Sequence, residues 1–340
     1  MLNLRDSYGG TDPILTTLAQ GYALPETNIA NFIAPVVDTP TRAGRILRFG
    51  KEQFAINDYR RAYGTNIPAV QSRFDSEPYT VEQEVIAWEI PEEVIENAGE
   101  GPAQVDLRAI ETRNAMKRLM NSYEKTVADG VAVSAAYETN LAFATWTLFQ
   151  AAYPGAGNEN WTDPTNTSDP IKDVVIIKRQ VANQIGIRPN SMVLGSAVYD
   201  NLLVNSKIEE RIKYTTVASI DIDVIARYFG LSRGIRVAEG RFLETDGRLL
   251  PVFPENAILV FYSPLGPSDS VMPAGGASMS TPAYAYTYQL TGTPAVRPEY
   301  FVRERRVVRA EITVERIVNL VGLGATGLIG SGFYIADILA

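Results

Sequence analysis

The chain has 340 residues and a hydrophobic content of 46%, which is enough to bury a large core in one domain or two. Its net charge is −8, and it contains neither cysteine nor histidine. Without cysteine, disulfides, iron–sulfur clusters and thiolate metal sites are excluded. Without histidine, a Ser-His-Asp triad and an imidazole-bound zinc site are excluded as well. Enzymes that use only carboxylates, Lys, Arg, Ser or Tyr remain open.

The acidic balance makes the chain a poor candidate for tight binding to the nucleic-acid backbone, because such binding needs clustered cations. It suits a soluble protein, or one that lies near packed DNA without adhering to it. The start of the chain has no basic segment followed by an apolar one, so we expect no secretion signal. Residues 320–340 carry one charge, Asp337, but five glycines interrupt them. We therefore expect buried strands and glycine turns there instead of a membrane anchor.

The first third of the sequence predicts an arm and then a projecting loop. Residues 1–30 have weak periodicity and several Gly and Pro breakers, so we expect an extended arm without a core of its own. Strands are predicted over 45–49 and 80–88. A long polar and aromatic insert separates them. Inserts of this kind inside a compact domain are usually projecting functional loops.

The clearest helix is predicted over 105–133, where apolar residues recur in steps of three and four. Asp106 is the expected N-cap, with Pro102 just upstream. After a break at 153–164 the pattern becomes α/β. Asp169 and Pro170 predict a helix start, and Gly186 predicts its end. Further helices are expected near 196–204, 206–214 and 221–229, and strands at 191–195, 235–239, 257–262, 283–290 and 300–315.

An ordered series of short segments in the second half resembles one that recurs in phage capsid proteins. It consists of Arg188-Pro189-Asn190 before the strand at 191–195, then 206–215, then Tyr228-Phe229-Gly230-Leu231, then Val237-Ala238-Glu239-Gly240. The chain thus resembles the Hong Kong 97 (HK97) type of capsid fold, in the subgroup of the lambda-like major head proteins. The resemblance covers roughly residues 30–320, and it rests on the order of the segments because no single residue is diagnostic.

The resemblance implies an α+β fold in five parts. These are an N-terminal arm (1–30), an extended β-hairpin loop with flanking strands (31–97), a peripheral domain with a long spine helix (98–165), an α/β axial domain (166–295), and a return strand of the peripheral domain with a C-terminal tail (296–340). The implied function is that of a major capsid protein, which assembles into hexamers and pentamers of an icosahedral shell around double-stranded DNA. Such a protein is part of the virion, is assembled in the host bacterial cytoplasm, and has no catalytic site, cofactor or metal.

The implied partners are further copies of the chain, a portal protein, an optional decoration protein, and packaged DNA held by weak non-specific contact. Only about 30 residues precede the resembling part, too few for a scaffolding region that is cleaved off, so we expect a separate scaffolding protein. Lys51 is the only lysine in the projecting loop, and nothing marks it for cross-linking. Contacts between subunits are expected from the arm, the loop and the glycine-rich tail. The candidate contact residues are Phe54, Tyr59, Arg60, Arg61, Tyr63, Arg303, Arg305 and Arg306.

Two other functions remain open. The first is the shell of an encapsulin-type compartment, and the second is a carboxylate- or lysine-dependent enzyme. Acidic pairs at 92–93, 209–210 and 221/223 fit solvated helix ends better than a catalytic or metal site. Gly322 to Gly327 matches G-x-G-x-x-G without the βαβ unit that nucleotide binding requires. The arginines at 303–316 alternate with glutamates, which favours salt bridges to neighbouring subunits over a DNA site.

Overall fold

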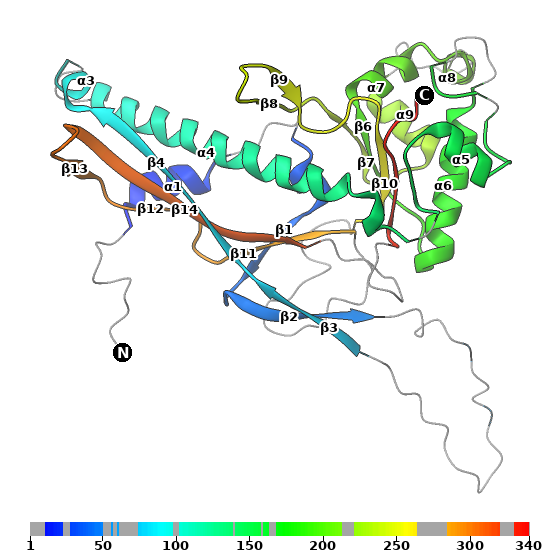
Figure 1. The fold of residues 1–340 in the computed structure, drawn as a ribbon, viewed down its shortest axis with the longest axis horizontal. Helices are drawn as coiled ribbons and strands as arrows, with labels where there is room; N and C mark the ends of the chain where they lie inside the picture. Colours follow the sequence, from blue (N-terminus) through cyan, green and yellow to red (C-terminus); the bar gives the residue numbers. More distant parts are fainter. Residues whose placement is uncertain are drawn as a thin grey trace, which may run out of the picture.

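The computed structural model describes residues 11–22, 28–49, 56, 60, 74–97, 102–138, 140–157, 159–162, 168–212, 221–263, 284–319 and 330–339. The molecule is elongated (Figure 1). A long helix, α4 (Pro102–Val131), runs from a twisted sheet at one end to a compact α/β lobe at the other. A two-stranded ribbon projects from the side of the sheet. At about 1.5 Å per residue, α4 spans roughly 45 Å.

The sheet under α4 is organised around its longest strand, β14 (Val307–Asn319). β4 (Glu82–Pro91) pairs antiparallel with β14 along one side, with Trp88 opposite Ala310. The other strands of this sheet are β1 (Val36–Thr39), β11 (Tyr286–Leu290), β12 (Ala295–Val296) and β13 (Tyr300–Val302). Alternate side chains of β14, among them Ile312 and Val314, are buried in the core that also contains residues of α4. The period of two follows because one face of the sheet is covered and the other is not.

The lobe at the other end contains a five-stranded sheet. Its strand order is β5 (Ala142–Phe143), β15 (Gly332–Ile335), β10 (Ile258–Phe261), β6 (Ser191–Gly195) and β7 (Gly234–Ala238). β6 and β10 are buried at every position, as expected of short apolar strands covered on both faces. The surrounding helices are α5 (Trp146–Ala152), α6 (Pro170–Ile185), α7 (Ser196–Leu203), α8 (Ser206–Ile212) and α9 (Ile222–Phe229).

Several predicted elements of this lobe are confirmed at their ends as well as in kind. The Asp169 side chain accepts a hydrogen bond from the Lys172 amide (3.1 Å), and Pro170 occupies the first turn of α6. Gly186 follows in a left-handed conformation with φ of 74°, which glycine adopts without steric cost. Asp221 and Gly230 bound α9 in the same way. Sequence signals were sufficient because both helices carry a cap, an apolar stripe and a glycine stop.

The described part of the predicted arm is helical and packs on its own chain, so the expectation of an extended arm is wrong for residues 11–22. Asp12 caps α1 (Pro13–Gln20), and its own amide donates to Val296 O (2.9 Å). Leu15 and Ala19 of α1 are buried in the core under α4. Beyond the linker, α2 (Ala30–Ile33) is also buried. The two buried residues of α2, Ala30 and Ile33, are too few to stand out in the sequence as an apolar stripe.

The buried strand expected in residues 320–340 is confirmed where the tail is described: β15 lies between β5 and β10 inside the lobe, with Phe333, Tyr334 and Ile335 buried. This part of the tail is therefore not a projection that is free to contact other subunits. Gly332 permits this position, since a Cβ there would lie 2.4 Å from the ring of Tyr284. Low charge in this segment therefore reflects burial. None of the described helices combines the length and apolar content that a bilayer-crossing helix needs.

Three further element boundaries differ from the prediction. Helix α4 begins at Pro102 instead of after an N-cap at Asp106, because proline fits the first helical turn, where its missing amide hydrogen is not needed. The strand expected at 300–315 is a hairpin, with a turn at 303–306 between β13 and β14. β2 (Ala43–Phe49) pairs with β3 (Phe74–Thr80), and not with 80–88. β3 is mostly polar in sequence and shows no apolar period, so it was not predicted as a strand. The short elements that complete the fold are α3 (Glu92–Asn97), a 3₁₀ turn (Ser134–Ala136), β8 (Arg241–Leu243) and β9 (Leu249–Pro251).

Gly195 marks the tightest approach in the lobe. A Cβ at this position would lie 2.1 Å from the backbone oxygen of Glu255, and a backbone atom cannot rotate away as a side chain does. We predict that Gly195→Ala lowers the free energy of unfolding by about 3 kcal/mol or more. Gly155→Ala is the control, because its Cβ would meet only Ile176 Cδ1, at 3.8 Å. Denaturant unfolding of both variants measures the difference, and equal stability would contradict the packing described.

Candidate functional site

The ribbon formed by β2 and β3 is the most detached part of the described structure. It runs from the pair Ala43–Thr80 to the pair Phe49–Phe74, and in the described part of the chain no third strand joins it. Its base is closed by the Val81 amide, which donates to Arg42 O (2.7 Å). An isolated two-stranded ribbon is marginally stable in water. This ribbon therefore gains stability if another surface covers it.

The ribbon's base is anchored by one aromatic contact. Tyr79 of β3 stacks on Tyr288 of β11, with ring centroids 4.9 Å apart. Arg42, just before β2, makes a bidentate pair with the buried carboxylate of Glu315, with both N–O distances at 2.6 Å. Of the candidate contact residues, Arg60 is exposed. The other candidates in the loop lie outside the described residues: Phe54, Tyr59, Arg61 and Tyr63.

The candidate arginines near the C-terminal end gather in the turn between β13 and β14. Arg305 pairs with Glu89 of β4 (3.3 Å), and Arg306 pairs with Glu92 of α3 (3.0 Å). Both guanidinium groups keep about two thirds of their surface exposed, at 66% and 68%. Arg303 is exposed in the same turn. Arg305 and Arg306 thus have carboxylate partners in their own chain, and their contact with a neighbouring subunit stays a prediction.

A different arginine fixes α4 on the sheet. The Arg316 side chain is 3% exposed and pairs with Glu84 at 2.5 Å. It also donates to the carbonyl of Leu119 in α4 (2.9 Å), and its guanidinium lies 4.3 Å from the ring centroid of Tyr123. A buried guanidinium is costly unless its donors are satisfied. These contacts supply the partners, and they join β14, β4 and α4 at one point.

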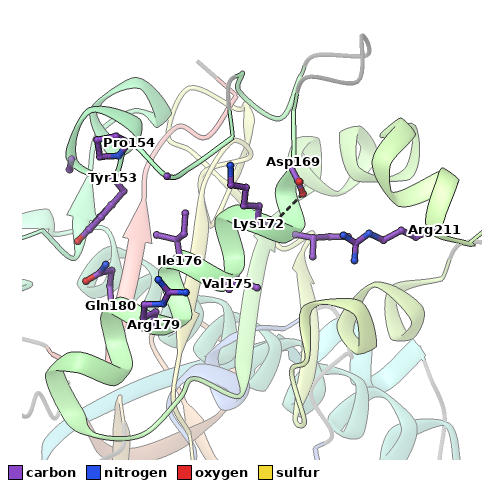
Figure 2. Close-up of a pocket in the computed structure, with 12 residues that line it drawn as sticks. Tyr153, Pro154, Asp169, Lys172, Val175, Ile176, Arg179, Gln180 and Arg211 are labelled. Carbon is purple, nitrogen blue, oxygen red and sulfur yellow. Dashed lines mark hydrogen bonds between the residues drawn. The ribbon is translucent and has the colours of Figure 1, made fainter.

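The lobe carries one open groove among the surfaces described, with a volume of about 740 Å³. It lies along the outer face of α6, between the end of α5 and Arg211 of α8 (Figure 2). Tyr153, Pro154, Val175 and Ile176 supply apolar walls. The charged lining residues are Asp169, Lys172, Arg179 and Arg211. We call this surface the α6 groove. Three of its four charged residues are cations. The fourth, Asp169, accepts a hydrogen bond from a helix amide as the cap of α6, so it is not placed as an activated nucleophile.

The acidic pairs from the sequence do not converge on a site. Glu92 pairs with Arg306, Glu209 and Glu210 are exposed on α8, and Asp221 caps α9. Within the described ranges, no group of three or more acidic side chains is placed to hold a metal ion. The glycine motif at 322–327 lies outside the described residues. The described geometry therefore favours surfaces for contact over a catalytic cleft.

One buried polar cluster was not predicted from the sequence. Asp173 of α6 is fully buried and accepts hydrogen bonds from Gly157 N (2.7 Å), Trp161 Nε1 (2.9 Å) and Trp146 Nε1 (3.5 Å). Burial raises the pKa of its carboxyl, and the three donors oppose that shift. The cluster holds the segment after α5 against α6. Its only sequence signal is an acid inside an otherwise apolar stripe, which solvated helices also show.

Comparisons with known proteins agree with this description. Residues 147–267 match the family model described as "Phage major capsid protein E". The chain is 27% identical over 292 residues to the major capsid protein of Burkholderia phage BcepMu, covering 84% of this chain and 85% of that protein. A solved phage-related protein from Bordetella bronchiseptica RB50 superposes with a TM-score of 0.73 at 26% identity, covering 97% of this chain and 98% of the other.

More distant structures share the fold. The capsid of Cyanophage P-SCSP1u matches with a TM-score of 0.52 at 9% identity, covering 92% of this chain and 89% of that one. The virus-like particle of Pyrococcus furiosus matches with a TM-score of 0.50 at 12% identity, covering 95% and 97%. At such identities the likeness concerns the fold alone.

The fold is thus the HK97-type capsid fold. Together with the contact surfaces described above, this fold places the chain in the class of structural shell proteins. The sequence matches are to phage proteins, which favours a virus shell over an encapsulin-type compartment and over an enzyme. The chain is similar to phage major capsid proteins, and it is a structural capsid shell protein that associates with copies of itself.

The Asp173 cluster generates a testable stability difference. Asp173→Asn replaces an acceptor with a donor opposite the indole or amide hydrogens, so we predict a loss of about 1–3 kcal/mol in the free energy of unfolding. Trp161→Phe should cost more than Trp146→Phe, since its bond to Asp173 is shorter (2.9 against 3.5 Å). Chemical denaturation of the unassembled subunit measures each loss. A larger loss for Trp146→Phe would contradict the assigned geometry.

The same residue gives a pH dependence with a definite sign. Because the pKa of Asp173 is raised in the folded chain, that chain retains a proton at pH values where the unfolded chain has lost it. The stability of the wild type relative to Asp173→Asn should therefore fall as the pH rises through the raised pKa. Denaturation of both proteins at a series of pH values measures this, and a difference that grows with pH would contradict it.

Proposed function

We propose that the chain builds a closed icosahedral shell of hexamers and pentamers around double-stranded DNA. The observation that carries this proposal is the β2–β3 ribbon, which leaves the subunit from a closed base and has no further strand partner among the described residues. A closed shell repeats the same contacts around symmetry axes, so each subunit must offer complementary surfaces at several edges. A projection meets this need by burying its area on a neighbour.

The ribbon and the loop at its end are the contact element in this proposal. The aromatic candidates Phe54, Tyr59 and Tyr63 would act as anchors, because interface cores favour aromatic side chains. Arg60 and Arg61 would pair with acids of the next subunit. Each contact is modest, but a subunit that makes several at once is held far more firmly than one contact allows.

The division into domains is part of the same proposal. The arm (1–30), the loop region (31–97), the peripheral domain (98–165), the axial domain (166–295) and the returning segment (296–340) would act as semi-independent parts of the subunit. Two separate buried clusters support this division, one under α4 and one in the lobe. α4 belongs to both, since Met116 lies in the first and Val127 in the second.

The remaining partners belong to the proposal as well. We propose assembly in the host bacterial cytoplasm with a separate scaffolding protein, a portal protein at one vertex, and an optional decoration protein. The packaged DNA would be contacted weakly and without sequence preference, in keeping with the net charge of −8.

Removal of the ribbon tests the proposal most directly. We predict that replacing residues 45–78 with an Asn-Gly turn leaves the subunit folded and abolishes shell assembly. Arg45 and Pro78 are removed along with this segment, so the turn is closed by Gly44 and Tyr79, which lie two residues from the hydrogen bond between Val81 N and Arg42 O and hence in the register that a two-residue turn needs, and Tyr79 still covers Tyr288. Denaturant unfolding should give a midpoint close to that of the full chain. Intact particles from the shortened chain in electron micrographs would refute the proposed role of the ribbon.

The arginine turn gives a second, independent test. Arg305→Gln combined with Arg306→Gln should lower subunit stability by less than about 1 kcal/mol, because exposed ion pairs contribute little. If these side chains also contact a neighbouring subunit, the yield of assembled particles should fall while the unfolding midpoint stays the same. Sedimentation of particles and unfolding of subunits separate the two effects. An unchanged particle yield would show that the arginines serve only their own chain.

A further inference from the structure

The solvent face of α4 has an unusual charge pattern. Between residues 107 and 128 the exposed positions recur every three or four residues and form one stripe along the helix. Its charged members in this range are all cations, and the next exposed position along the helix, Asp129, is an acid paired with Lys125. The exposed residues of this stripe are Ile110, Arg113, Asn114, Lys117, Arg118, Ser122 and Thr126. This concentration of positive charge stands out in a chain whose net charge is −8.

On the sheet face that points away from α4, the charged side chains are paired with one another. The register of β4 on β14 places Arg309 opposite Glu89 on the side of the sheet away from α4, and their side chains pair at 3.4 Å. On that side Arg297 also pairs with Glu311, at 3.1 Å. Acids and bases therefore alternate there and satisfy one another. The two faces of this helix-on-sheet layer differ in their unmatched charge.

The stripe has no such compensation in the described part of the chain. Arg113, Lys117 and Arg118 make no ion pair with any described carboxylate. Their neighbours on the helix that do form pairs lie outside this group: Arg108 pairs with Glu299 (3.2 Å), and Lys125 pairs with Asp129. Three cations on about two turns of helix repel one another unless anions lie against them.

We propose that this cationic stripe faces the interior of the shell and contacts phosphate groups of the packaged double-stranded DNA. The proposal rests on the proposed function, because it needs a shell that encloses DNA. Arg113 and Lys117 lie about 6 Å apart along the helix axis. That spacing is within reach of successive phosphates, since duplex DNA presents a charge roughly every 1.7 Å along its axis.

The composition of the stripe favours nucleic acid over a protein partner. Asn114 and Ser122 are side chains that donate hydrogen bonds to phosphate oxygens without reading sequence, whereas the Thr126 hydroxyl donates to the Ser122 carbonyl of its own helix (3.0 Å). A docked protein would need apolar or aromatic anchors, and the stripe offers only Ile110, at 48% exposure. Three cations per subunit give weak binding to one molecule. Many copies on one inner wall give a combined hold that still lets the DNA slide.

Binding of a short fluorescent DNA duplex of random sequence to the unassembled subunit tests the chemistry. For the triple variant Arg113→Gln, Lys117→Gln, Arg118→Gln, we expect weaker binding at low salt. The slope of log K against log salt should become shallower by about three. The matched control makes the same change in charge at the α6 groove, through Lys172→Gln, Arg179→Gln and Arg211→Gln. An equal loss in the control, or no loss in the stripe variant, would overturn the proposal.

The absence of cysteine allows the orientation to be tested in assembled shells. Ser122→Cys places a single thiol on the stripe, and Gln83→Cys places one on the opposite face of the sheet. In intact particles a maleimide carried on a polymer too large to enter should label Gln83→Cys and leave Ser122→Cys unlabelled until the shell is dissociated. Prompt labelling of Ser122→Cys in intact shells would overturn an inward-facing stripe.

A third outcome separates this inference from the function on which it rests. If the triple glutamine variant forms no particles while its DNA binding equals that of the wild type, the stripe docks a protein such as a scaffold, and the DNA proposal is wrong. If the wild-type chain itself forms no particles, the shell proposal is wrong, whatever the duplex measurements give. Particle formation is scored by electron microscopy, and duplex binding by anisotropy on subunits.

Discussion

Strand β14 is the constraint on which the rest of the molecule depends. It pairs with β4 along one side and with three shorter strands along the other. Its alternate side chains form the floor for α4, and Arg316 joins the strand to the helix by the Leu119 carbonyl and the Tyr123 ring. Isolated helices owe little of their stability to propensity, so the direction of α4 is set by this floor. That direction in turn fixes where the lobe and the ribbon lie relative to each other.

The sequence predicted best those elements whose own residues carry all the information. α6 and α9 have a capping acid, an apolar stripe and a terminal glycine, and they were predicted nearly to the residue. β6 and β10 were predicted because a short apolar run bounded by turns suits a strand that is buried on both faces. The HK97-type fold followed from the order of these segments, and the comparisons confirm it.

The missed features depend on contacts between distant residues. β3 is mostly polar in sequence and shows no apolar period, and only its pairing with β2 makes it a strand. A buried strand was expected in the tail, but its place in the lobe sheet was not, because it depends on the approach of Gly332 to Tyr284, more than forty residues away along the chain. Asp173 is held by two tryptophans from a different segment. Of the candidate contact residues, the structure gathers Arg303, Arg305 and Arg306 in one turn, while their role toward other subunits is still a prediction.

The hydrogen bond from Val81 N to Arg42 O has a consequence for how such a protein diversifies. It brings the two ends of the ribbon together, so that the chain leaves the core and returns to it at the same place. An insertion, deletion or exchange beyond this point leaves the folding of the core largely unaffected. The ribbon is in this respect a transplantable module. Under the proposed function, a change in the ribbon would alter which subunits recognise one another without redesigning the body that carries it.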